Sequence, residues 1–178
     1  SSTSKLPITW TEADEAGTLT RLHKLRQEVI DPCLIRHRGR LVKSTGDGLL
    51  VEFQSVVDAL GCAVEVQRAL AGSNSADASA PRFEFRVGIN LGDVIVVDGD
   101  LFGDGVNIAA RLQEQAEPGG IFVSKAVREQ VGDRLAVAFE DLGERQVKNI
   151  ARPIHVYRAT IPGLAPAPAI GRPTGESK

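Results

Sequence analysis

Residues 102–112 read FGDGVNIAARL, and this stretch decides what fold and what chemistry the chain is expected to have. Its Gly-Asp-Gly start predicts the beginning of a helix that runs to about Gln115. Asn107 and Arg111 stand four apart among apolar neighbours, so both side chains emerge on one face of that helix. A guanidinium suits phosphate oxygens because it can donate two parallel hydrogen bonds. The pair by itself is more typical of an exposed polar face, so phosphate binding is the alternative interpretation.

Residues 41–53, LVKSTGDGLLVEF, predict a hairpin of two short strands. An Asp-Gly pair between apolar runs supplies the positive φ angles that a tight hairpin requires, which places Asp47 at the tip. A carboxylate at this tip suits magnesium, a hard cation that prefers oxygen ligands. Taken alone, however, Asp-Gly is better explained by turn chemistry.

The remaining periodicity predicts an α+β chain. A first helix is expected from Asp14 to about His37, with its final turns bent or broken by Pro32. The other expected elements are a helix over 56–70, a loop over 73–81, strands over 83–90, 93–97, 121–123, 135–140 and 154–160, and a short helix over 125–131. This order predicts a ferredoxin-like sandwich, with helices packed on one face of a mainly antiparallel sheet.

Composition favours one soluble domain that binds a small ligand. The chain has 178 residues, of which 42% are hydrophobic and 25% charged, and its net charge of -2 gives no general attraction to nucleic acid. Recognition of RNA by such a sheet needs exposed aromatics, and the only candidates, Phe83 and Phe85, look like core residues. No apolar run is long enough to span a membrane. Cys33 and Cys62 lack metal-ligand spacing and are expected to be buried thiols in a reducing cytoplasm.

Three segments together resemble a known family. Residues 41–53, residues 86–93 (RVGINLGD) and residues 102–112 look like consecutive signature blocks of the class III adenylyl and guanylyl cyclases, in that family's order and spacing. The resemblance covers about residues 12–160 and implies a nucleotide cyclase catalytic domain over 12–161. Residues 1–11 are then expected to be a segment outside the family pattern, and 162–178 a linker or tail rich in Pro, Ala and Gly.

The resemblance implies conversion of ATP to cyclic AMP and pyrophosphate. Asp47 matches one of two aspartates that hold a pair of Mg²⁺ or Mn²⁺ ions, which activate the ribose 3′-hydroxyl and hold the triphosphate. Asn107 matches the residue that orients the ribose, and Arg111 the one that stabilises the transition state at the α-phosphate. Lys148 matches the family's triphosphate-binding lysine.

The resemblance also implies a base preference and a dimer. Lys43, four residues before Asp47, and Asp100, seven before Asn107, are the adenine-selecting combination. Lys43 would donate to the ring N1 and Asp100 would accept from the 6-amino group, where guanine has a carbonyl. The family's site forms between two chains arranged head to tail, so a homodimer is implied in which Lys43 and Asp47 serve opposite sites.

The N-terminus departs from the family. The position of the first-strand aspartate falls at about Thr3, and residues 1–11 carry no carboxylate. The central first strand is therefore expected to be missing or replaced, with residues 6–10 a poor substitute because Pro7 suits a sheet edge. A truncated or mis-called start, an omitted stretch of sequence and a naturally defective homologue all remain open. In the last case the domain would bind nucleotide or dimerise in a regulatory role.

Overall fold

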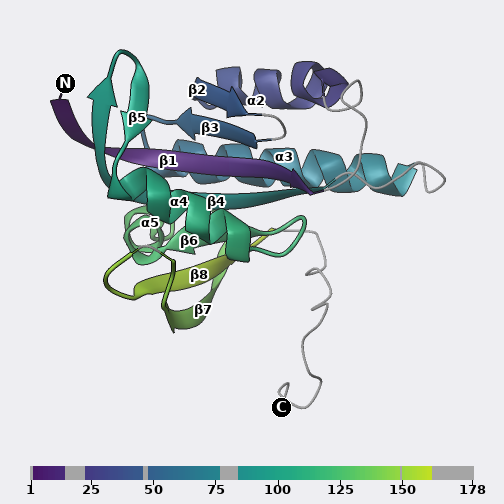
Figure 1. Cartoon of the computed structure of the whole chain (residues 1–178). Coiled ribbons are helices and arrows are strands. Elements are labelled where there is room, and N and C mark those ends of the chain that lie inside the picture. Colours follow the sequence, from purple (N-terminus) through teal and green to yellow (C-terminus); the bar gives the residue numbers. More distant parts are fainter. Residues whose placement is uncertain (1, 15–22, 46–47, 77–83, 149, 162–178) are drawn as a thin grey trace, which may run out of the picture.

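A computed structural model describes residues 2–14, 23–45, 48–76, 84–148 and 150–161, and shows one eight-stranded sheet with helices packed on it (Figure 1). The sheet order is β2-β3-β1-β4-β6-β8-β7, and β5 pairs with β4. β4 and β6 pair in parallel and the other pairings are antiparallel, so the predicted α+β class is confirmed. The strands are β1 (Ser2–Asp14), β2 (Arg40–Thr45), β3 (Gly48–Glu52), β4 (Glu84–Val97), β5 (Asp100–Phe102), β6 (Ile121–Ser124), β7 (Ala138–Arg145) and β8 (Ile154–Thr160).

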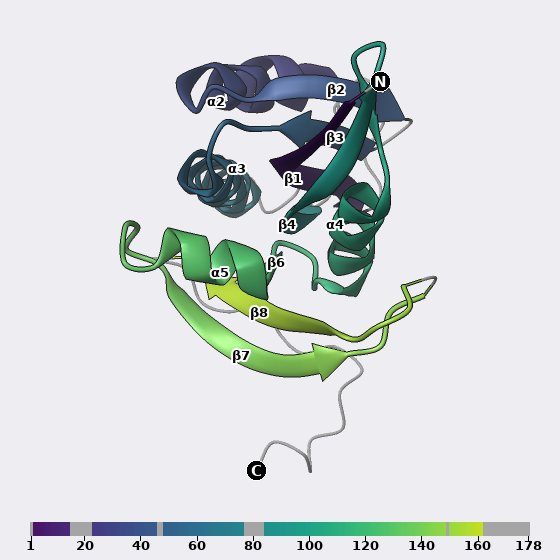
Figure 2. The ribbon, with the colours of Figure 1, turned by 90° about the vertical axis from the view of Figure 1, so that its left-hand side faces the viewer.

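Helices cover both faces of the sheet, which corrects the expectation of a single helical face. The helices are η1 (Arg26–Ile30), α2 (Asp31–Arg36), α3 (Val56–Ala76), α4 (Asp104–Gln115) and α5 (Lys125–Val131). Figure 2 shows α2, α3 and α5 on one side of the sheet and α4 on the other. Leu50 packs with Ala109 of α4, whereas its neighbours Leu49 and Val51 belong to the larger core under α3. The alternation of a strand's side chains thus supplies two separate cores.

The central slot of the sheet is filled by β1, which corrects the expectation that residues 6–10 fill it poorly. β1 pairs with β4 along its whole length, from Ser2 opposite Val96 to Asp14 opposite Glu84, and with β3 from Ile8 to Glu12. Pro7 is tolerated because β3 ends at Glu52, opposite Ile8; the Pro7 carbonyl still accepts the Phe53 N–H at 3.0 Å. The boundary expected between residues 11 and 12 falls inside this strand.

Several expected element limits are wrong. Asp14 ends β1 and does not begin a helix, while residues 15–22 lie outside the described part. Pro32 sits in the first turn of α2, directly after η1, at the point where the helix changes from π to α geometry. α3 continues to Ala76, into the expected loop, and the two strands expected over 83–97 form the single strand β4. β7 begins at Ala138 rather than at 135.

Helix α4 lies unusually close to β4 because glycines remove the side chains between them. A Cβ built on Gly88 would lie 2.4 Å from both the Ala109 carbonyl oxygen and the Gln113 nitrogen. A Cβ on Gly105 would lie 2.5 Å from the Asp93 carbonyl oxygen. The atoms that an added Cβ would meet belong to the backbone, which cannot rotate away as a side chain can. Any residue other than glycine at these two positions would therefore push the helix off the strand. The contact fixes both the height and the rotation of α4 on the sheet.

Gly88→Ala is expected to destabilise the fold by about 2 kcal/mol or more, because the new methyl group overlaps the α4 backbone. Gly72→Ala is the matched control, since a Cβ there meets nothing within 4 Å and α3 is helical at that point. This control is expected to gain roughly 0.5–1 kcal/mol. Urea unfolding measures both, and equal stability of Gly88→Ala and the parent chain would contradict the packing described.

A small cavity of about 30 Å³ lies between β1 and α3. Thr9 lines it, is buried, and finds no hydrogen-bond partner for Oγ1 among the described residues. Cys62 lines the same cavity, and Cys33 lies in the same core; both are free thiols, as expected. Burial raises the pKa of Cys33 to about 11 and that of Cys62 to about 12, so both stay protonated at neutral pH.

Thr9→Val is expected to raise the free energy of unfolding by roughly 1 kcal/mol, because it removes a buried hydroxyl without a partner. Thr11→Val is the comparison, since Thr11 lines the same cavity but is only half-buried. Thermal or urea unfolding measures both. A loss of stability in Thr9→Val would instead indicate that the hydroxyl holds a water molecule in the cavity.

Candidate functional site

The outward face of α4 carries two of the predicted site residues. The buried residues of this helix are Gly105, Ala109, Leu112 and Gln113, so Asn107 and Arg111 point away from the sheet. Asn107 is exposed, and the Arg111 side chain is 24% exposed. Arg111 Nη1 donates to Glu114 Oε2 at 2.7 Å, and its Nε finds no partner among the described residues. Glu114 is well exposed, so this ion pair is weak and easily exchanged for a ligand.

The structure also brings the predicted base-reading residues together. Lys43 Nζ lies 3.1 Å from Asp100 Oδ1, although β3, β1 and β4 separate their strands in the sheet order. The Leu101 backbone N–H donates to Asp100 Oδ1 at 2.7 Å and holds the pKa of Asp100 below its ordinary value, and Lys43 lowers it further. Asp100 is therefore an ionised, acceptor-only carboxylate at neutral pH. An ammonium donor and a carboxylate acceptor stand side by side.

The turn that carries Asp100 is held against β2. β4 and β5 are joined through Asp98 and Gly99, which have φ angles of 51° and 81°. Arg40 of β2 donates to the Gly99 carbonyl at 3.2 Å. Arg40 is itself fixed by two hydrogen bonds to Glu52, at 3.0 and 3.1 Å. The β4–β5 hairpin therefore reaches over to the edge of the sheet, as Figure 1 shows. The sequence had indicated no role for Arg40.

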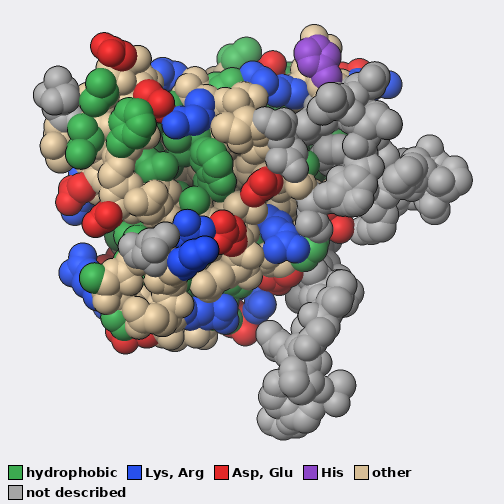
Figure 3. All heavy atoms as spheres, viewed as in Figure 1, with side chains coloured by type: hydrophobic (Ala, Val, Ile, Leu, Met, Phe, Trp, Pro, Cys, Tyr) green, Lys and Arg blue, Asp and Glu red, His purple; other side chains and the backbone are tan. Residues whose placement is uncertain are grey.

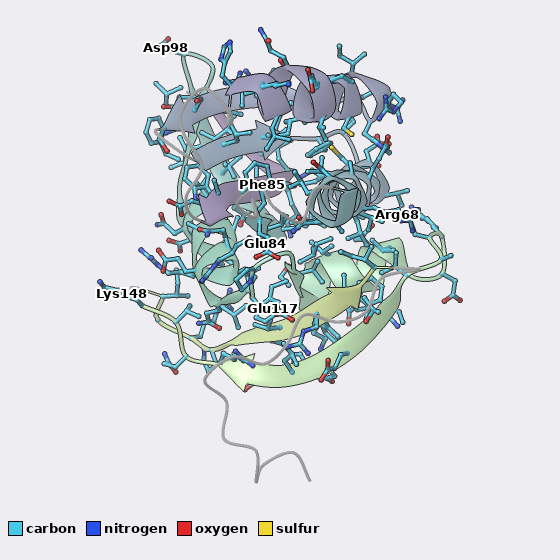
Figure 4. All side chains as sticks on the ribbon, turned by 90° about the vertical axis from the view of Figure 1, so that its right-hand side faces the viewer. Arg68, Glu84, Phe85, Asp98, Glu117 and Lys148 are labelled. Carbon is cyan, nitrogen blue, oxygen red and sulfur yellow. The ribbon has the colours of Figure 1, made fainter. Side chains whose placement is uncertain are left out.

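The two remaining predicted site residues are Lys148 and Asp47. Lys148 is exposed in the connection between β7 and β8, and Figure 4 shows it projecting on the side of α4. Asp47 lies outside the described residues, so its predicted place at the hairpin tip stays a prediction. Among the described residues, no three His, Cys, Asp or Glu side chains form a group that could hold a metal ion.

The end of β1 places a carboxylate residue beside this hairpin. Glu12 pairs with Gly48, the residue that follows Asp47, and on its other side with Arg86. Leu6, Ile8 and Trp10 pack on the α4 side of the sheet, so the alternation of the strand puts Glu12 on that side as well. Sequence reasoning missed this position because it expected no strand beyond residue 10 and a helix from Asp14.

A separate cleft lies at the start of α4. This cleft of about 800 Å³ runs between the start of α4, β4 and the β7–β8 hairpin, and Asp93, Gly105, Ser124, Arg152 and His155 are among its lining residues. Of the predicted site residues that the structure describes, Lys43, Asp100, Asn107, Arg111 and Lys148, none lines this cleft.

The sheet is mainly antiparallel, and α4 is the only described helix on its face. Asn107 and Arg111 on this helix, together with the Lys43–Asp100 pair, are the arrangement expected of a nucleotide cyclase catalytic domain. The family described as "Adenylate and Guanylate cyclase catalytic domain" matches residues 9–159. The chain belongs to this family, as its signature blocks predicted.

Relatives and solved structures agree with this assignment. The chain is 47% identical over 146 residues to a protein of Rhizobium meliloti named "Putative adenylate cyclase 3", covering 82% of this chain and 25% of that protein. It is 38% identical over 121 residues to an adenylate cyclase of Streptomyces coelicolor, covering 67% of this chain and 29% of that protein. The chain thus spans between a quarter and a third of these relatives.

Among solved structures, an adenylate/guanylate cyclase/hydrolase from Silicibacter pomeroyi superimposes with a TM-score of 0.80 at 40% identity, covering 90% of this chain and 98% of that chain. An adenylyl cyclase from P. aeruginosa superimposes with a TM-score of 0.72 at 22% identity, which shows the shared fold. It covers 89% of this chain and 96% of that chain. None of the described helices is long and apolar enough to cross a membrane.

Proposed function

We propose that this domain converts ATP to cyclic AMP and pyrophosphate. The observation that supports the proposal is the Lys43–Asp100 pair, whose 3.1 Å contact joins a donor to an acceptor at the two positions to which the resemblance assigns base reading. Adenine offers the complementary pattern, an N1 acceptor beside a 6-amino donor. Guanine reverses it, so an ionised Asp100 would face a carbonyl oxygen and lose binding energy.

The chemistry is the attack of the ribose 3′-oxygen on the α-phosphorus. The new P–O bond closes the 3′,5′ ring, the bond to the β-phosphate oxygen breaks, and pyrophosphate leaves while the 3′-hydroxyl proton is released. Arg111 would donate to the α-phosphate oxygens as charge builds on them, and Asn107 would hold the ribose. Lys148 would bind the triphosphate as a mobile cation.

Divalent cations, when bound, would lower the pKa of the 3′-hydroxyl and gather charge from the phosphates. The described residues of one chain do not form a set of ligands for them, and Asp47 alone is the proposed ligand from the sequence. Use of Mg²⁺ or Mn²⁺ is therefore part of the proposal, supported by membership of the family.

A head-to-tail homodimer would complete the site, with Asp47 from one chain facing Asn107 and Arg111 of the other. Exposed apolar side chains on the β4–β5 hairpin, Ile95, Val97 and Phe102, support a protein-covered surface there. Figure 3 shows apolar side chains gathered on the face that carries α4.

The first experiment measures cyclic AMP and cyclic GMP formed from ATP and GTP with Mg²⁺ or Mn²⁺, with EDTA as the blank. Cyclic AMP is expected to dominate, and Arg111→Ala is expected to lower kcat by about 10²–10³ because one transition-state donor is lost. Arg134→Ala, an exposed arginine outside the site, is the control and should match the parent chain. Cyclic GMP as the main product would refute the proposed base preference.

The second experiment mixes two inactive variants, Asp47→Asn and Arg111→Ala. In a head-to-tail dimer, a mixed pair keeps one site with both residues intact. Equal mixing should restore about a quarter of the parent activity, since half of the dimers are mixed and each has one of two sites. No recovery on mixing, with subunit exchange verified, would argue against a site shared between chains.

The alternative function is a cyclase-like module that binds nucleotide or dimerises without turnover. It is favoured because residues 2–14 fill the central slot and carry no carboxylate before Glu12. The metal-binding aspartate that the family has in this strand is therefore missing from its expected position at about Thr3. Under this alternative, the parent chain forms no cyclic nucleotide with either metal ion yet still binds ATP. Equilibrium dialysis of ATP together with the activity assay separates the two functions.

A further inference from the structure

One aromatic side chain stands beside the base-reading pair and has no role in the chemistry described so far. Phe102, at the end of β5, is 47% exposed, which is unusual for so large an apolar residue. Its ring centroid lies 5.4 Å from Lys43 Nζ, within the range of a cation–π contact. The Lys43 ammonium is thus attracted by the Asp100 carboxylate and by the Phe102 ring together.

We propose that Phe102 is a positioning residue for base selection, which holds the Lys43 ammonium at the place where adenine N1 would meet it. The inference rests on the proposed function, because it assumes that Lys43 and Asp100 read the base. It adds a residue that determines specificity through another side chain and that is not itself required to touch the nucleotide.

The two members of the pair are held to different degrees. Asp100 is short, accepts the Leu101 N–H at 2.7 Å, and sits on a turn tied to Arg40 through Gly99. Lys43 has a long, flexible side chain that is 34% exposed, and restraining such a chain costs conformational entropy. The lysine is therefore the member whose position depends on additional contacts, and the ring supplies one.

The ring can also keep this role after a nucleotide arrives. When Asp100 accepts a hydrogen bond from the adenine 6-amino group, it holds Lys43 less strongly than before. A cation–π contact does not use the hydrogen-bonding protons of the ammonium, so Lys43 remains free to donate to N1 while the ring still attracts it. A leucine of similar bulk would fill the space without this attraction.

The test compares Phe102→Leu, which removes the ring, with Phe102→Tyr, which keeps it. Ile95→Ala is the control, because Ile95 is the cross-strand partner of Phe102 and is also exposed, but has no ring. The first measurement is the NMR shift of the Lys43 ε-methylene protons without nucleotide. A ring-current shift is expected in the parent chain, Phe102→Tyr and Ile95→Ala, and is expected to vanish in Phe102→Leu.

The second measurement is the ratio of the Kd values for ATP and GTP, by competition against a fluorescent nucleotide, with Lys43→Ala alongside. Loss of the ring should lower the preference for ATP by about two- to fivefold, the effect of an exposed cation–π contact. Phe102→Tyr and Ile95→Ala should keep the parent ratio.

These measurements distinguish failure of the Phe102 positioning role from failure of the proposed base reading by Lys43. An unchanged ratio in Phe102→Leu, while Lys43→Ala lowers it, overturns the positioning role and leaves the proposed function standing. An unchanged ratio in Lys43→Ala shows that Lys43 does not read the base, and then the base-reading assignment and this inference fall together. A parent chain without the ring-current shift likewise overturns the positioning role.

Discussion

The backbone contact between α4 and β4 is the constraint on which the rest of the candidate site depends. Gly88 and Gly105 let the helix rest directly on the strand, and Asn90 adds a buried hydrogen bond from Nδ2 to the Gly105 carbonyl at 3.1 Å. Because this close contact prevents α4 from rotating on β4, Asn107 and Arg111 must face outward. Gly103 directly joins β5 to the start of α4, so the position of Asp100 in β5 also depends on the contact between α4 and β4.

The Lys43–Asp100 pair, proposed to read the base, depends on a second, longer-range arrangement. Lys43 lies on the edge strand β2 and Asp100 on β5, which pairs only with β4 in the described sheet. They meet because the β4–β5 hairpin extends past its neighbours and is tied to β2 through Arg40. Under the proposed function, base specificity therefore depends on how this hairpin folds over the sheet, and mutations in its turn would alter specificity without touching the nucleotide.

The N-terminal strand shows how a slot in a sheet can be filled by an unexpected sequence. Without a strand in the slot, its neighbours β3 and β4 would have unpaired backbone N–H and C=O groups, which cost free energy when buried. Any extended segment, whether its side chains are polar or apolar, can pair with these groups. Residues 2–14 satisfy both neighbours, and their alternating side chains supply Ile8 to one core and Ala13 to the other. Filling the slot depends on backbone pairing alone, and it is independent of the aspartate that the family resemblance implies in this strand.

The sequence by itself determined the family, the hairpin strands, α4 and the shared face of Asn107 and Arg111, because these depend on local turn chemistry and helical spacing. It also indicated the Lys43 and Asp100 roles, through resemblance to the family. Only the tertiary structure decided that residues 2–14 form the central strand, that α4 occupies the face opposite α3, and that Lys43, Asp100 and Phe102 meet. These features rest on contacts between segments far apart in the chain, and local periodicity carries no information about such contacts.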